Sequence, residues 1–276
     1  MALLAAHRAR AAGGDAGGDG GGAIAAIERR HGGRLGVFVL DVGSGRTLAH
    51  RADERFLLQS TFKGFLAAMV LRRVADGRDR LDEELSYGRP ELLPTSPVTE
   101  AAVAQGRLSI ERLCAAILER SDNTAANLLL RHVGGPAALT AYVRGLGDPV
   151  TRFDRYELIG GRDGDEDTST PRAVATTART LLLGTALPVA ERARLEGWMA
   201  NNLPGRNRLR AAFPKDWAAC DRTGTSDGVC NDYALARRPG RGALVMAAYY
   251  EAPGMEMPAQ EAALREVGAA IVGWAG

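Results

Sequence analysis

The sequence predicts an α/β protein of the α+β kind, in which an antiparallel five-stranded sheet is flanked by helices and carries an inserted all-helical subdomain. Three observations support this prediction. Strand patterns occur near the two ends of the chain, the long segment between them has mostly helical spacing, and the last segment is an amphipathic helix. The two strand-rich ends can share one sheet, so we expect a functional site at the interface between the sheet and the helical part.

The chain begins with a stretch that we expect to lie outside the fold. Residues 1–22 are rich in glycine and alanine, and their apolar run is shorter than the roughly 7–15 residues of a secretory signal core. We therefore expect a flexible tail over 1–22. The elements expected after it are a helix over 23–31 and a hairpin with strands over 35–40 and 47–50.

The middle of the chain has the apolar spacing of helices. The expected helices begin at Ser60 and Pro171, span 110–118 and 124–133, and include 195–199. The stretch 152–170 interrupts this pattern because it is polar and contains glycines. We expect a long loop there, and a long loop inside a compact domain usually has a function.

The C-terminal part returns to strands. Strands are expected over 217–225, 229–236 and 243–250, followed by a helix over 259–274. Asp227-Gly228 suits a two-residue hairpin turn, in which residue 220 faces 235 and residue 225 faces 230. Cys220 and Cys230 then lie too far apart for a disulfide. Cys114 lies in an apolar helical pattern and is expected in the core.

The composition indicates one domain and excludes several partners. A chain of 276 residues that is 46% hydrophobic can bury a substantial core, and we expect one domain over 23–276, with a sheet part (23–58 plus 201–276) and a helical part (59–200). The net charge is only +2 and the arginines are scattered, which argues against a nucleic-acid partner. No apolar run approaches the roughly 20 residues of a membrane span, so we expect no membrane partner.

The sequence predicts neither a metal nor a cofactor. The four histidines form no cluster at the spacing of metal ligands, which argues against a zinc hydrolase. They are His7, His31, His50 and His132.

The first candidate for chemistry is Ser60-Thr61-Phe62-Lys63, at the expected start of a helix. A hydroxyl is a weak nucleophile until a base takes its proton. Positions i and i+3 share a helix face, so Lys63 can reach the Ser60 oxygen. The helix N-terminus adds positive potential and free N–H groups, which suit a developing oxyanion. Taken alone, the motif also fits a capping serine with a solvent-facing lysine.

The second candidate is Ser121-Asp122-Asn123, just before a helix. A second hydroxyl can pass a proton to a leaving nitrogen, and a side-chain amide can hold a substrate amide. Taken alone, these three residues also fit a cluster that caps the helix.

The third candidate is Arg222-Thr223-Gly224-Thr225, on a strand that ends in a hairpin. A cation and a hydroxyl side by side can receive a substrate carboxylate, and the Thr225 backbone N–H can point at a carbonyl oxygen. Taken alone, the segment also fits an ordinary strand end with a surface arginine.

The three motifs occur together in the order S-x-x-K, S-D-N, K-T-G that penicillin-recognising serine enzymes share. Ser121 follows Ser60 by 61 residues, and Arg222 follows Ser121 by 101. On these motifs the chain resembles a class A serine β-lactamase, and the resemblance covers residues 23–276.

The resemblance implies acyl transfer followed by hydrolysis, with a small-molecule β-lactam as the partner. Ser60 would attack the lactam carbonyl, and its proton would go to Lys63 or, through water, to Glu157. Ser121 would protonate the lactam nitrogen. The remaining implied roles are an oxyanion hole from the backbone N–H groups of Ser60 and Thr225, an acylamide contact from Asn123, and substrate carboxylate binding at Arg222, Thr223 and Gly224.

The segment Asp154-Arg155-Tyr156-Glu157 resembles the family's Ω-loop, which supplies the deacylating carboxylate. Glu157 would then act as general base on a water. Arg155 and Asp167 match the pair of opposite charges at the base of that loop.

The chain departs from the family pattern at several positions. Arg222 replaces the usual lysine, and we expect its longer planar head to lose the contact that a lysine makes to Ser121. The Ω-loop is about three residues shorter than usual and lacks the asparagine that helps to hold the water. Arg208 matches a position where some members carry an extra carboxylate-binding arginine, and a surface arginine is the alternative.

Two other functions remain open from the sequence. The chain could be a penicillin-sensing domain that is acylated without turnover, which the altered Ω-loop favours and Glu157 disfavours. It could also be a D-Ala-D-Ala peptidase, which the Ω-loop disfavours. The family resemblance further implies a monomer in the periplasm or outside the cell, although no signal peptide is evident in the sequence.

Overall fold

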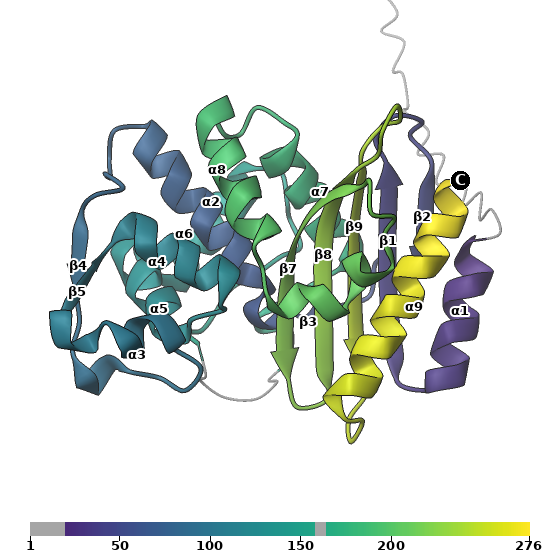
Figure 1. Cartoon of the computed structure of the whole chain (residues 1–276), viewed down its shortest axis with the longest axis horizontal. Helices are drawn as coiled ribbons and strands as arrows, with labels where there is room; N and C mark the ends of the chain where they lie inside the picture. Colours follow the sequence, from purple (N-terminus) through teal and green to yellow (C-terminus); the bar gives the residue numbers. More distant parts are fainter. Residues whose placement is uncertain (1–19, 158–163) are drawn as a thin grey trace, which may run out of the picture.

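The structure is a computed structural model that describes residues 20–157 and 164–276. A sheet part and a helical part lie next to each other (Figure 1). The sheet has five strands in the order β2-β1-β9-β8-β7, and all neighbouring strands are antiparallel, as the sequence predicts. Its strands are β1 (Arg34–Asp41), β2 (Thr47–His50), β7 (Ala218–Ser226), β8 (Val229–Arg237) and β9 (Leu244–Glu251).

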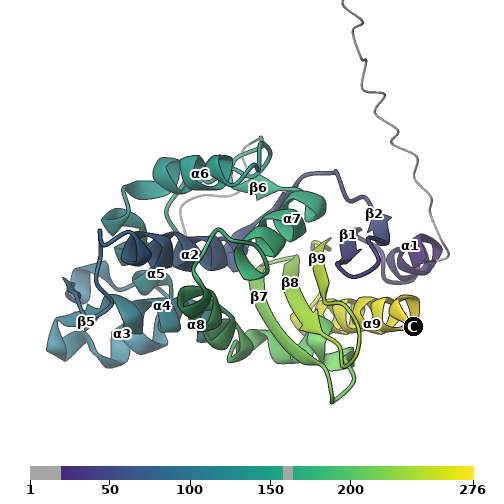
Figure 2. The same cartoon turned by 90° about the horizontal axis from the view of Figure 1, so that it is seen from above.

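Helices cover both faces of this sheet (Figure 2). Helices α1 (Gly20–His31) and α9 (Met257–Ala275) pack together on one face, and α7 (Pro171–Leu182) packs on β1, β8 and β9 from the other. Helix α7 was expected in the helical part, yet it also covers one face of the sheet. Helix α1 begins at Gly20, so the expected tail boundary at residue 22 is wrong. Glycine is a poor helix former, so the glycines at the start of α1 give no sequence signal for a helix. Residues 1–19 lie outside the residues that the structure describes.

The helical part surrounds α2, which carries the nucleophile motif at its start. Its helices are α2 (Phe62–Ala75), α3 (Pro97–Ala101), α4 (Ile110–Glu119), α5 (Asn123–His132), α6 (Gly135–Gly145) and α8 (Val189–Ala200). Short 3₁₀ turns are η1 (Gln59–Thr61), η2 (Arg89–Glu91), η3 (Val103–Gln105), η4 (Pro204–Asn207) and η5 (Leu209–Ala212). No helix in the described ranges is both long and apolar enough to cross a membrane.

The helical part is not all-helical, which corrects the sequence prediction. It contains the antiparallel pair β4 (Glu84–Ser86) and β5 (Arg107–Ser109), and β3 (Phe56–Leu57) pairs with β6 (Thr168–Ser169). These strands have only two or three residues each. Such short strands cannot show the alternation by which a strand is recognised in a sequence.

The hairpin β7–β8 has the predicted register. Cys220 pairs with Leu235 and Thr225 with Cys230 across the two strands. Cys114, Cys220 and Cys230 are buried and free, so the prediction that Cys220 and Cys230 do not form a disulfide is confirmed.

Two hydrophobic cores lie on opposite faces of the sheet. Successive residues of a strand point to opposite faces. Tyr249 accordingly belongs to the core shared with α2, and Tyr250 belongs to the core under α1 and α9. Phe65 of α2 stacks on Tyr233 of β8, with ring centroids 5.5 Å apart. This packing places the start of α2 against the edge strand β7.

Candidate active site

Ser60 lies in the 3₁₀ turn η1, immediately before α2. The preceding residue, Gln59, has a φ of 48°. A non-glycine residue in this region is strained by roughly 1–3 kcal/mol and persists only where its surroundings hold it. Gly224 of β7 provides part of that support, because a Cβ at this position would lie 2.6 Å from the carbonyl oxygen of Leu58. The glycine therefore allows β7 to lie directly against the nucleophile turn.

Lys63 points its ammonium group at Ser60, as the i, i+3 spacing predicts. Its side chain is fully buried, and Nζ lies 3.0 Å from Ser60 Oγ. Nζ also contacts the Ser121 carbonyl at 2.9 Å and Ser121 Oγ at 3.3 Å. Two further oxygens lie close to it, Asn123 Oδ1 at 2.6 Å and Glu157 Oε1 at 2.7 Å. Lys63 therefore joins the nucleophile to the second motif and to the Ω-loop segment.

Burial lowers the pKa of Lys63 to about 8, although the negative charge of Glu157 opposes this shift. The positive charge of Arg222 lowers the pKa further. A lysine with a pKa close to neutral has a substantial neutral fraction and can accept a proton.

Glu157 also contacts Ser60, the candidate nucleophile. Its Oε1 accepts a hydrogen bond from Ser60 Oγ at 3.1 Å, and its backbone N–H donates to Asn127 Oδ1 at 2.9 Å. Burial raises the pKa of Glu157, but the charge of Lys63 and the hydrogen bonds from Lys63 and Ser60 outweigh it, so the pKa is lowered. The carboxylate is therefore ionised at neutral pH.

The second motif both caps a helix and lines the site. Asp122 Oδ1 accepts from Ala125 N at 2.9 Å and caps α5, while Asn123 Oδ1 lies on Lys63 Nζ. Ser121 has a φ of 60°, and this strained conformation is held by the buried cap beside it. Within this motif, Asp122 therefore caps the helix, and its neighbour Asn123 faces Lys63 in the candidate site.

Arg222 contacts Ser121, so the expectation that its head would lose this contact is wrong. The guanidinium Nη2 donates to Ser121 Oγ at 2.7 Å, and Nε donates to the Ser60 carbonyl at 3.0 Å. The close packing of β7 on η1 and the bond to Ser60 turn the planar head across the site. Burial lowers the pKa of Arg222 to about 10, so the side chain stays charged at neutral pH.

A buried polar network behind Arg222 was missed in the sequence analysis. Asn202 accepts a long hydrogen bond from Arg222 Nη1 at 3.4 Å and donates to Asp221 Oδ2 at 3.0 Å. Both Asn202 and Asp221 are fully buried. No local signal marks Asn202, because it follows α8 and reaches Arg222 only through the folding of the chain.

Arg208 is buried, so the surface interpretation of this residue is wrong. It is 2% exposed, and Nη1 donates to the carbonyls of Gly224 and Asn231 at 2.9 and 2.7 Å. Its Nη2 donates to Thr225 Oγ1 at 2.6 Å. Arg208 thus orders the exposed end of β7, where Thr225 lies beside the buried Thr223 and Gly224.

The base of the Ω-loop is closed by the predicted pair. Arg155 Nε lies 2.5 Å from Asp167 Oδ2, and Asp167 Oδ1 accepts the backbone N–H groups of Asp154 and Arg155 at 2.8 and 3.2 Å. The expected shortening of the loop falls on a segment that includes residues 158–163, which lie outside the described residues.

His132 lies near two carboxylates, although no spacing in the sequence shows it. His132, Asp79 and Glu83 form the group that could hold a metal ion among the described residues. Arg73 donates to both oxygens of Asp79, at 2.6 and 2.8 Å. The group is therefore explained as an ion-pair network, and it lies outside the site around Ser60.

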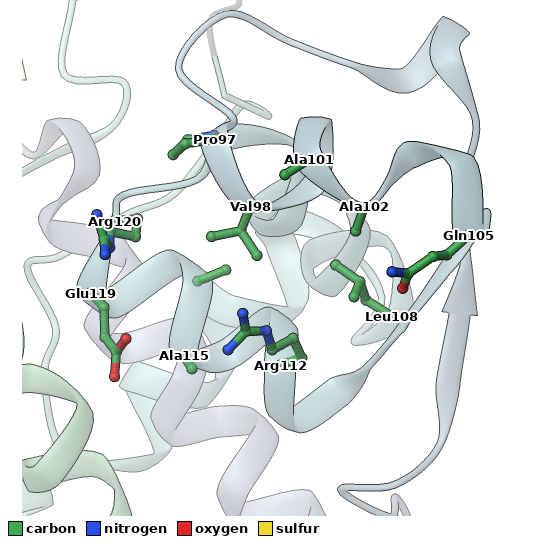
Figure 3. Close-up of a pocket in the computed structure, with 11 residues that line it drawn as sticks. Pro97, Val98, Ala101, Ala102, Gln105, Leu108, Arg112, Ala115, Glu119 and Arg120 are labelled. Carbon is green, nitrogen blue, oxygen red and sulfur yellow. The ribbon is translucent and has the colours of Figure 1, made fainter.

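A hollow of about 510 Å³ lies in the helical part, between α3 and α4. Figure 3 shows its apolar floor, which includes Val98, Ala101 and Leu108, with Arg112 and Arg120 at its margin. None of the described residues that line it contacts Ser60, so the candidate catalytic groups meet elsewhere, between α2, α5 and β7.

Comparison with known proteins agrees with this geometry. A model of the β-lactamase enzyme family matches residues 22–275. The chain is 44% identical to a carbapenem-hydrolyzing β-lactamase KPC of Klebsiella oxytoca, over 87% of this chain and 83% of that protein. It is 43% identical to a β-lactamase of Mycobacterium tuberculosis, over 90% and 83% of the two chains.

Solved structures show the same relationship. A β-lactamase from Burkholderia vietnamiensis superposes with a TM-score of 0.92 at 59% identity and covers 94% of this chain and 97% of its own. An ancestral class A β-lactamase superposes with a TM-score of 0.90 at 47% identity, over 93% and 100% of the two chains. With the family model matched along nearly its whole length, the chain belongs to the β-lactamase enzyme family, in class A.

Proposed function

We propose that this β-lactamase hydrolyses the ring of penicillins and cephalosporins through an acyl-enzyme on Ser60, which a water activated by Glu157 then releases. One observation carries the proposal. Ser60 Oγ lies within hydrogen-bond distance of two groups that can accept its proton, Lys63 Nζ at 3.0 Å and Glu157 Oε1 at 3.1 Å.

In the acylation step, Ser60 Oγ bonds to the lactam carbonyl carbon while its proton moves to a base. Lys63 can accept it in its neutral form, and Glu157 can accept it directly or through a water. The backbone N–H groups of Ser60 and Thr225 receive the developing oxyanion.

Collapse of that intermediate breaks the bond between the carbonyl carbon and the ring nitrogen. Ser121 supplies the proton that the nitrogen needs. Its Oγ accepts hydrogen bonds from Lys63 Nζ at 3.3 Å and Arg222 Nη2 at 2.7 Å. Since both neighbours are donors, the hydroxyl keeps its own proton for a third group, which is the leaving nitrogen. Lys63 can return a proton to Ser121 afterwards.

Substrate binding is assigned to the strand β7 and the start of α5. Arg222 with Thr223 and Gly224 receives the substrate carboxylate, and the charge of the buried guanidinium supports this role. Asn123 holds the acylamide. Arg208 contributes through Thr225, whose hydroxyl it orients, and adds positive potential for the carboxylate.

Deacylation depends on Glu157. Once Ser60 is esterified its oxygen has no proton, so the hydrogen bond to Glu157 is lost and the carboxylate can bind a water instead. Transfer of a proton from that water to Glu157 generates the nucleophile that breaks the ester. A sensor that stays acylated would lack this step.

Turnover of a chromogenic cephalosporin separates these functions. We expect many turnovers for the wild type and a persistent acyl adduct in Glu157→Ala, seen as a mass increase on the peptide that contains Ser60. Ser60→Ala should abolish both adduct and turnover. A single stoichiometric burst from the wild type would instead identify a sensor, and hydrolysis of D-Ala-D-Ala peptides without lactam turnover would identify a peptidase.

The proposal includes a monomer in the periplasm or outside the cell, as the family resemblance implies. Gel filtration of the purified protein and fractionation of expressing cells test these two parts.

A further inference from the structure

One row of residues across the sheet faces the turn that carries Ser60. The row contains Gly36 of β1, Tyr249 of β9, Asn231 of β8 and Gly224 of β7, which are paired with one another in that order. Residues that are paired across neighbouring strands point to the same face of a sheet. Because Tyr249 belongs to the core shared with α2, the whole row faces the chain that leads into this helix.

The two glycines of the row make room for that chain. A Cβ at Gly36 would lie 2.3 Å from Cε2 of the Phe56 ring, and a Cβ at Gly224 would lie 2.6 Å from the Leu58 carbonyl oxygen. Real Cβ atoms essentially never approach other heavy atoms this closely. The chain between Phe56 and Leu58 therefore lies directly on the sheet.

Asn231, between these glycines, holds the same chain by hydrogen bonds. Its side chain is fully buried, and its Nδ2 donates to the Leu57 carbonyl at 2.7 Å and to the Leu58 carbonyl at 3.4 Å. Its Oδ1 accepts the backbone N–H of Tyr250 at 3.2 Å, so the sheet itself orients the amide. Asn231 thus ties the chain just before the Ser60 turn to the middle of the sheet.

Tyr249 holds the turn on its other side. The side chain is buried, and its hydroxyl donates to Thr61 Oγ1 at 2.9 Å. The Thr61 hydroxyl in turn donates to the Leu58 carbonyl at 2.6 Å, which closes the turn. Ser60 therefore lies between a segment held by Asn231 and a residue held by Tyr249.

The turn between these two contacts is strained. Gln59 has a φ of 48°, a conformation that persists only where the surroundings over-determine it. The backbone N–H of Ser60 follows it directly, and the backbone N–H of Thr225 follows Gly224 on β7. In the proposed acylation these two N–H groups receive the oxyanion together. Their separation is therefore set by how the turn lies on the row.

We propose that Asn231 and Tyr249 are positioning residues for acylation, which hold the Ser60 turn on the sheet so that the two N–H groups of the oxyanion hole face the same carbonyl oxygen. The inference rests on the function proposed above, because that function assigns these N–H groups to the oxyanion. The substrate carboxylate is assigned to side chains of β7. Loss of the positioning contacts should therefore lower the rate of ring opening more than the affinity for substrate.

Stopped-flow acylation by a chromogenic cephalosporin separates rate from affinity, because it gives a plateau rate and a half-saturating concentration. Asn231→Leu keeps the approximate size of the side chain and removes the donor. We expect the plateau to fall by about 10–10²-fold and the half-saturating concentration to change by less than about twofold. Tyr249→Phe removes only a hydroxyl, and its plateau should fall by about 3–10-fold.

Tyr250→Phe is the matched control. Tyr250 is the next residue of β9 and points to the opposite face, where its hydroxyl donates to the Gly32 carbonyl at 2.9 Å. The variant loses one tyrosine hydrogen bond, as Tyr249→Phe does, and keeps the backbone N–H that Asn231 binds. The two variants should lose similar unfolding free energy, and only Tyr249→Phe should slow acylation.

The fraction of molecules that becomes acylated is counted by mass spectrometry, so that incomplete folding of Asn231→Leu is not read as a slow rate. If this variant does not fold, Tyr249→Phe decides. An unchanged plateau in either folded variant, or an equal fall in Tyr250→Phe, would overturn the positioning role. A plateau that falls only together with a large rise in the half-saturating concentration would indicate substrate binding and would overturn it too.

The two proposals fail in different ways. The plateau reports ring opening, so it is defined even if the wild type is acylated and not hydrolysed. That outcome would contradict the proposed hydrolysis alone and leave the variants to decide on the positioning role. A wild type that is not acylated at all would overturn both proposals.

Discussion

The two halves of the site differ in how firmly the fold holds them. Four residues of the first half lie at the starts of α2 and α5, and Arg222 lies in the middle of β7. Hydrogen bonds connect these five residues to one another through side chains or backbone, and the four at the helix starts are Ser60, Lys63, Ser121 and Asn123. Glu157 comes from a loop. It is held by one backbone bond to Asn127 and by its contacts with Lys63 and Ser60.

This difference separates the two chemical steps. Strained residues occur in both halves, Gln59 and Ser121 in the acylation half and Asp167 at the base of the loop, so strain does not distinguish them. The acylation half differs in that its groups bond directly to one another. The deacylation half depends on a loop whose base is closed by Arg155 and Asp167. Changes in the first half should therefore affect ring opening, and changes in the loop should affect release of the acyl group.

Among variants that keep Ser60, the largest effect is expected from Lys63→Met. The variant removes a base and the cation that joins the two halves, so acylation should slow by about 10²–10⁴-fold. Stopped-flow measurement with a chromogenic cephalosporin gives the acylation rate. Lys215→Met removes an exposed lysine and is the matched control. Acylation by Lys63→Met at a rate close to that of the control would mean that Glu157 alone activates Ser60.

Asp167→Asn tests the loop half. The ion pair to Arg155 is lost, Glu157 is positioned less precisely, and deacylation should slow by up to about 10²-fold. Acylation should change much less, so a burst should become visible. Asp165→Asn, an exposed position in the same segment, controls for loss of charge. Equal slowing of both steps would show that the two halves are not separable.

Gly64→Ala tests the packing of the acylation half. A Cβ at residue 64 would lie 1.7 Å from the Tyr233 hydroxyl. Overpacking of this kind costs about 1–3 kcal/mol of unfolding free energy, measured by urea titration. Tyr233→Phe removes the clashing oxygen, so the double variant should recover part of the loss. If the double variant instead loses as much unfolding free energy as the two single variants together, this explanation is contradicted.

The smallest effect expected is a pH shift. If neutral Lys63 is the acylation base, the rate should rise with pH and level off above the pKa of about 8. The negative charge of Glu157 raises the pKa of Lys63, so in Glu157→Gln the midpoint should move to lower pH. The pH profile of the acylation rate checks this direction, and an upward shift would rule out Lys63 as the titrating base.

Much of the fold was predictable because the signals are local. The Asp227-Gly228 turn sets the register of β7 and β8, and apolar spacing locates α4 and α5. The pair β4–β5 was not predictable, because strands of three residues have no measurable alternation. The start of α1 was missed since glycines carry no helix signal.

The residues of the site can be separated in the same way, into those that local sequence patterns predict and those that only tertiary contacts bring together. The sequence by itself determined which residue types are present for acyl transfer: two hydroxyls, a lysine, an arginine and a carboxylate, in motifs with a fixed order. It also determined that Lys63 reaches Ser60, because three residues along a helix return to the same face.

Only the tertiary structure decided how Arg222 meets Ser121, that Arg208 is buried, and that Asn202 lies behind the site. These contacts join residues that are 101, 16 and 20 positions apart in the chain. No local pattern encodes them. They arise because β7 packs on the nucleophile turn closely enough to require Gly224, and that packing belongs to the assembled sheet and helices.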